Sequence, residues 1–123
     1  MDYLALKLLH IVAVLFMFTA LGATVMHVIG GGTKADNPWR VPLSIIHGVS
    51  LLIILIAGLW ILIQWGIKPS DFEGWVWAKL LIWALFGAAI VLPYKVPQSA
   101  KLLMLILPLL GALATWLAIF KPF

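Results

Sequence analysis

The chain has 123 residues, of which 65% are hydrophobic and only 10% are charged, and its mean hydropathy is +1.18. Soluble domains carry about 25% charged residues, so this composition excludes an ordinary soluble domain and indicates a membrane protein. The net charge of +4 comes from single, scattered basic residues, which suits anchoring in a bilayer better than nucleic-acid binding, and the absence of cysteine excludes disulfides and thiolate metal sites.

The first predicted element is an apolar helix over residues 4–29. About 20 apolar residues cross the hydrocarbon of a bilayer, so this segment is long enough to span it. The stretch "GGGTKADNPWR" then interrupts the apolar pattern and is predicted to be a loop. A second spanning helix is predicted over residues 42–65, with Pro42 in its first turn.

The second half of the chain repeats this alternation. After the loop "GIKPSDFEG", a third helix is predicted over residues 75–92, ending at Pro93. After "YKVPQSAK", a fourth is predicted over residues 102–120, with Pro108 as a tolerated kink. We therefore expect one domain, residues 1–123, that is an all-α integral membrane four-helix bundle with short loops and antiparallel neighbours.

Basic residues in the loops predict an orientation in the membrane. The end that holds both termini has Lys68 and Lys121, and the opposite end has more basic residues, namely Lys34, Arg40, Lys95 and Lys101. Cytoplasmic loops carry the excess of Lys and Arg. We therefore expect the termini on the non-cytoplasmic side of a bacterial inner membrane.

Four ionisable residues inside the predicted spans are candidates for a functional site. At 1.5 Å per residue, His10 lies about 9 Å into the first helix and Lys79 about 6 Å into the third, both from the end that holds the termini. His27 and His47 lie near the opposite end. Ionisable residues inside a membrane are usually functional. His10 with Lys79 forms one layer, and His27 with His47 forms the other. In each layer, side chains from two helices are available to bind a cofactor.

Each candidate also has a purely structural explanation. The Lys79 side chain can extend toward the headgroups beside Trp75 and Trp77. A neutral His10 can hydrogen-bond to a neighbouring helix, and the other two histidines are close enough to an interface to be hydrated.

Two tryptophans lie deeper than an interfacial belt requires. Trp60 and Trp83 belong to the same half of the predicted bundle as His10 and Lys79. They are candidates for the walls of an aromatic cofactor pocket, and core packing is the alternative explanation.

Four short motifs carry a resemblance to a known family. "LKLLHIVAV" with His10, "LIAGLWIL", "GWVWAKLL" with Lys79 and the terminal "FKPF" are similar to the small four-helix membrane protoporphyrinogen oxidases of the HemJ type, which are near the copper-resistance D-like membrane proteins. The resemblance implies that the protein binds haem b and oxidises protoporphyrinogen IX to protoporphyrin IX. It also implies that His10 and Lys79 are the functional pair.

The sequence departs from that family in two places. The first loop offers only Lys34 and Arg40 where the family has more arginine, and "VPQSAK" replaces a polar Asn-Glu-Pro-like segment before the last helix. Anionic propionates need cationic partners, and arginine supplies the bidentate ones. The fold and haem site are therefore compatible with a chain that lacks the oxidase reaction.

Three classes of function follow from these patterns. The first is a haem b-associated redox protein, either the oxidase or a cytochrome b-like carrier that works with a porphyrin or a quinone; His10 is the expected iron ligand, and His27 with His47 forms a rival pair. The second is a cofactor-free accessory subunit of a larger respiratory or photosynthetic membrane complex, or a homo-oligomer. The third is copper handling through Met17, Met26 and His27. Without cysteine, these residues provide few of the soft ligands that Cu(I) prefers.

Overall fold

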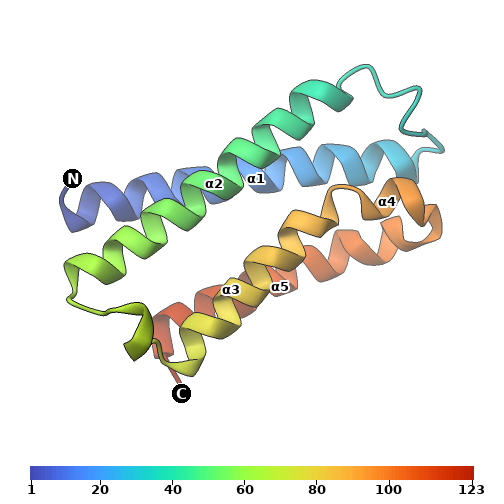
Figure 1. Ribbon diagram of the computed structural model, residues 1–123. Coiled ribbons are helices and arrows are strands. Elements are labelled where there is room, and N and C mark those ends of the chain that lie inside the picture. Colours follow the sequence, from blue (N-terminus) through green and yellow to red (C-terminus); the bar gives the residue numbers. More distant parts are fainter.

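The computed structural model describes residues 1–123 and is entirely helical (Figure 1). The helices are α1 (Tyr3–Ile29), α2 (Arg40–Gln64), α3 (Gly74–Ala89), α4 (Leu92–Lys95) and α5 (Ala100–Phe120), with 3₁₀ turns at Pro69–Asp71 and Pro97–Ser99. The predicted all-α class is confirmed. Three stretches, Tyr3–Ile29, Arg40–Gln64 and Pro97–Phe120, are long and apolar enough to cross a membrane, whereas α3 is a shorter apolar helix.

The long helices lie side by side, and the chain turns back between them (Figure 1). Both termini lie at one end, here called the terminal end, together with the α2–α3 connection. The opposite end, here called the loop end, holds the α1–α2 loop and α4. Helix α1 packs mainly on α2 and also on α5, while α3 packs on α5 and on α2.

Small residues explain the close packing of α1 on α2. Ala13 and Ala20 on α1 are buried, as are Ser50 and Ala57 on α2, and each pair is separated by seven residues. A seven-residue spacing keeps one face of a helix toward its partner over successive turns. Small side chains on that face let the two backbones approach closely, as is common between membrane helices.

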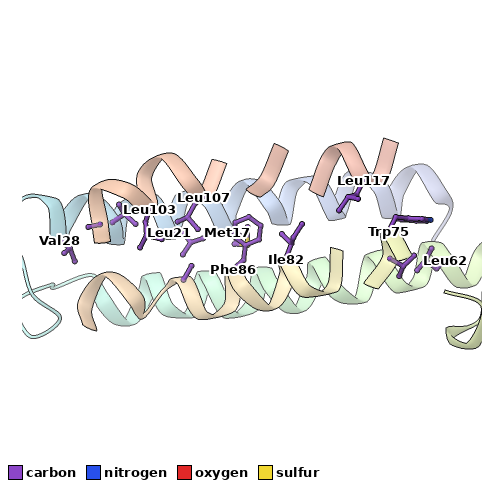
Figure 2. Packing of buried hydrophobic residues seen from close by; sticks show 14 residues of the cluster. Met17, Leu21, Val28, Leu62, Trp75, Ile82, Phe86, Leu103, Leu107 and Leu117 are labelled. Atoms are coloured by element: carbon purple, nitrogen blue, oxygen red, sulfur yellow. The ribbon is translucent and has the colours of Figure 1, made fainter. Parts of the chain in front are cut away.

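Larger side chains fill the space between α1, α3 and α5 (Figure 2). Met17 and Leu21 of α1 meet Phe86 of α3 and Leu103 and Leu107 of α5 in this cluster. Each of these five side chains is almost completely buried. Buried apolar side chains from three helices therefore join the two halves of the chain.

Helix α3 ends three residues before the predicted end at 92, because of Pro93. Proline has no N–H, and its ring clashes with the carbonyl of the residue four positions earlier, which here is Ala89. The helix stops at Ala89, and Pro93 instead occupies the first turn of α4. The other boundaries differ less: α2 and α5 each begin two residues earlier than predicted, at Arg40 and Ala100.

Candidate functional site

His10 faces α2 and is held by a backbone carbonyl. Its Nδ1 lies 2.9 Å from the carbonyl oxygen of Ile54. Because a carbonyl only accepts, Nδ1 must carry the hydrogen, and the Nε2 atom of the neutral ring keeps its lone pair. A side chain at Gly58 would crowd the ring, since a Cβ there would lie 3.3 Å from Cε1. The imidazole is therefore fixed in orientation and tautomer, with one nitrogen able to bind a ligand.

Lys79 lies in the same region and has no acidic partner. Its side chain is half-buried, and the only ion pair of the structure joins His27 and Asp36 at the loop end. His10 lies in the first half of α1 and Lys79 in the first half of α3, so both are toward the terminal end, and Lys79 forms no ion pair there.

Lys121, which sequence reasoning left out of the site, borders this region. Its Nζ lies 5.7 Å from the ring centre of Trp65 and 5.3 Å from that of Trp75. The backbone N–H of Trp75 donates to the carbonyl of Phe123 at 3.0 Å, which holds the tail against the start of α3. The tail motif "FKPF" therefore places a further cation next to α3.

The two candidate tryptophans have different surroundings. The Nε1–H of Trp83 donates to the carbonyl of Leu51 at 2.9 Å, so this indole lies between α3 and α2. Trp60 is 41% exposed. Trp83 is thus partly buried between two helices, and Trp60 lies on the surface.

His47 hydrogen-bonds to the last turn of α3, whereas His27 hydrogen-bonds within the α1–α2 loop. Its Nε2 donates to the carbonyl of Phe86 at 2.9 Å, and the ring is buried. Phe86 is one of the last four residues of α3, and the carbonyls of those residues lack partners within the helix. An imidazole that supplies the missing donor stabilises the early end of α3.

His27 organises the α1–α2 loop. Its Nε2 lies 2.8 Å from Oδ1 of Asp36 and 2.9 Å from the carbonyl of Thr33, and both of these are acceptors. The Thr33 backbone N–H also donates to Oδ1 of Asp36 at 2.7 Å. The hydrogen bond from this N–H, and to a smaller extent the bond from His27, holds the pKa of Asp36 below its ordinary value. Both histidines of the rival pair thus use Nε2 in separate hydrogen bonds.

The methionines considered for copper do not converge. Met17 is buried, whereas Met26 is 55% exposed. They are nine residues apart on α1, which at 3.6 residues per turn places them on opposite faces of the helix. No group of three or more His, Asp or Glu side chains is arranged to hold a metal ion.

Sequence reasoning allowed a hydrogen bond from His10 to a neighbouring helix, which the structure contains, but it did not identify the backbone acceptors that orient these rings. The carbonyls of Leu51, Ile54 and Phe86 each receive a side-chain donor from a neighbouring helix. Backbone carbonyls are present at every residue, so the sequence does not distinguish these three. The available signal was the occurrence of imidazole and indole donors in apolar helices, where a buried donor requires an acceptor. No protein-family model matches the chain, and comparisons with curated proteins and with solved structures give no match either.

Proposed function

We propose that the chain is an integral membrane protein in which α1, α2, α3 and α5 span the bilayer as an antiparallel bundle. Three stretches have the length and hydropathy of a membrane span, and large apolar side chains such as Leu4, Leu8 and Leu15 are more than 60% exposed. Monomeric soluble proteins rarely expose such extended apolar surfaces. The positive-inside rule places the termini on the non-cytoplasmic side of a bacterial inner membrane.

We further propose that this protein binds haem b through His10, with Lys79 as the second functional residue. The observation that carries the proposal is the 2.9 Å contact between Nδ1 of His10 and the carbonyl of Ile54. Histidines that bind metals usually donate their other N–H to a carbonyl or carboxylate, which fixes the ring and raises its basicity. Haem, when bound, supplies one-electron redox chemistry.

Lys79 has two roles open to it in this proposal. Its ammonium group has no carboxylate within 4.0 Å, so it is free to pair with a propionate of the porphyrin or with a substrate carboxylate. In a region of low dielectric such a pair is stronger than in water. The resemblance to the HemJ-type oxidases favours the same two residues, and it extends the proposal to oxidation of a porphyrinogen.

The test is a spectrum of the detergent-purified protein, oxidised and dithionite-reduced, with a pyridine haemochrome assay for stoichiometry. We expect a Soret band that is lost in His10→Ala and kept in His47→Ala, which removes a histidine of similar surroundings. Loss in the His47 variant alone would support the rival pair. A colourless protein from haem-replete cells would contradict haem binding and favour the accessory subunit.

Membrane insertion is tested separately. Carbonate extraction should leave the protein in the membrane fraction, and reporter fusions to the N-terminus and to the α1–α2 loop should report opposite sides. Release by carbonate would contradict the membrane proposal whatever the spectrum shows.

A further inference from the structure

A shallow hollow at the loop end, largely open to the surroundings, combines positive charge with apolar side chains. It has a volume of about 450 Å³ and is lined by Lys34, Arg40, Val41, Ser44 and Ile45. Four of these residues belong to the first two turns of α2, and Lys34 comes from the preceding loop. Cationic and hydroxyl groups therefore lie next to two aliphatic side chains.

Neither cation of this hollow forms an ion pair within the protein. Asp36 is the nearest acid in sequence, but its carboxylate binds His27 and the Thr33 backbone. No carboxylate lies within 4.0 Å of Lys34 or Arg40. Helix α2 also begins without a side-chain cap and without an acidic residue in its first turn, so the helix dipole adds to the same positive potential.

The apolar part of the hollow continues onto the exposed face of α2. Val41 is 57% exposed and Ile45 is 59% exposed, and Trp39, just before the helix, is 67% exposed. Tryptophan is enriched at the level of lipid headgroups. The cations thus lie at the expected depth of the headgroups, and the exposed aliphatic side chains of Val41 and Ile45 lie next to them.

We propose that this hollow binds a membrane phospholipid with an anionic headgroup. Lys34 and Arg40 bind the phosphate, Ser44 donates a hydrogen bond to it, and one acyl chain lies along Val41 and Ile45. Charge complementarity selects the anionic lipid, and the adjoining apolar wall selects a lipid over a soluble phosphate. The inference rests on the membrane insertion proposed above and is independent of haem binding.

The charge-neutral double variant K34Q/R40Q tests the proposal. Native mass spectrometry of the detergent-solubilised protein gives the apparent affinity for phosphatidylglycerol and for phosphatidylcholine. Each cation near an anionic surface contributes enough to change binding about 5-fold, so the double variant should bind phosphatidylglycerol at least tenfold more weakly. Binding of phosphatidylcholine should not change.

The matched control is K95Q/K101Q. It removes the same charge from the loop end, but neither residue lines the hollow. Equal loss of phosphatidylglycerol binding in both double variants would overturn the proposal, because it would show general attraction by net charge. Equal affinity of the unmodified protein for the two lipids would also overturn it, and so would displacement of the lipid by equimolar glycerol phosphate.

The location of the bound lipid is checked in vesicles. Brominated phosphatidylglycerol should quench the emission of Trp39, measured as the difference between the unmodified protein and Trp39→Phe, more than brominated phosphatidylcholine does. Retention of the protein after carbonate with equal quenching would overturn this site alone. Release by carbonate would overturn membrane insertion and the lipid site together.

Discussion

Replacement of Gly58 by alanine tests whether close packing controls the His10 ring. A Cβ at this position would lie 3.3 Å from Cε1 of His10 and 3.6 Å from Nδ1. Carbon atoms are best separated by about 3.5–4.0 Å, so the ring must move by a few tenths of an ångström. Movement away from α2 lengthens the 2.9 Å bond from Nδ1 to the carbonyl of Ile54.

The expected change in the free energy of unfolding of Gly58→Ala is the difference between two opposing contributions. Alanine in a helix interior is more favourable than glycine by about 0.5–1 kcal/mol. Disturbing the His10 hydrogen bond costs about 0.5–1.5 kcal/mol. A Cβ added at Gly48 of the same helix would meet no atom within 4 Å, so Gly48→Ala keeps the whole gain. We therefore expect Gly58→Ala to be about 1 kcal/mol less stable than Gly48→Ala.

The assay is reversible unfolding in mixed detergent micelles, combined with haem content after purification. Under the proposed haem binding through His10, Gly58→Ala should also retain less haem than Gly48→Ala, because its imidazole is displaced. If both variants gained stability equally and had identical haem spectra, the packing of Gly58 against His10 would have no influence on the site.

Three further predictions follow from contacts at the site and in the loop. Lys79→Met should lower haem content or shift its spectrum, because the site loses its unpaired cation; the purified variant is examined by absorbance. Trp83→Phe should lower the free energy of unfolding by about 1 kcal/mol through loss of its hydrogen bond to α2, measured in mixed micelles. Hydrogen bonds from the Thr33 N–H and, to a smaller extent, from His27 hold the pKa of Asp36 below its ordinary value of 3.8. The ionised carboxylate therefore stabilises the fold above that pH. This contribution is lost as the pH falls through the lowered pKa. Asp36→Asn should therefore reduce the dependence of the melting temperature on pH in the acid range.

These predictions have matched controls and clear contradictions. Trp60→Phe changes an exposed indole, so equal destabilisation by both tryptophan variants would show that the Trp83 hydrogen bond is unimportant. Unchanged haem content and spectrum in Lys79→Met would mean that this side chain only anchors α3 at the interface. An unchanged acid profile in Asp36→Asn would mean that the Asp36 carboxylate makes no pH-dependent contribution to stability.

Hydrophobic patterning was sufficient to predict the four longer helices, because each apolar stretch is bounded by glycine, proline and polar residues, but it did not predict the short α4. The α3 boundary was wrong because the effect of Pro93 reaches back to Ala89, beyond the residue that precedes the proline. Patterning also predicted that His10 and Lys79 share one layer; each lies in the half of its helix, α1 or α3, that is nearer the terminal end. The depth of a residue along its helix can be calculated from its residue number and the rise of 1.5 Å per residue.

The partners of the side chains were not predictable in the same way. His10 bonds to Ile54 and His47 to Phe86 because of how the helices are rotated about their axes. That rotation depends on packing, including the small residues between α1 and α2, and the sequence of one helix does not determine it. For the same reason the outward position of Trp60 was not foreseen.

The early end of α3 has a consequence for the surrounding lipid. Its 16 residues, at 1.5 Å each, extend about 24 Å, whereas the hydrocarbon of a typical bilayer is about 30 Å thick. A helix that is too short is accommodated by local thinning of the bilayer, at a cost that grows with each ångström of mismatch. In a bilayer the side of the protein formed by α3 would therefore draw the two leaflets together and favour thin membranes, while the 27-residue α1 has length to spare and would tilt.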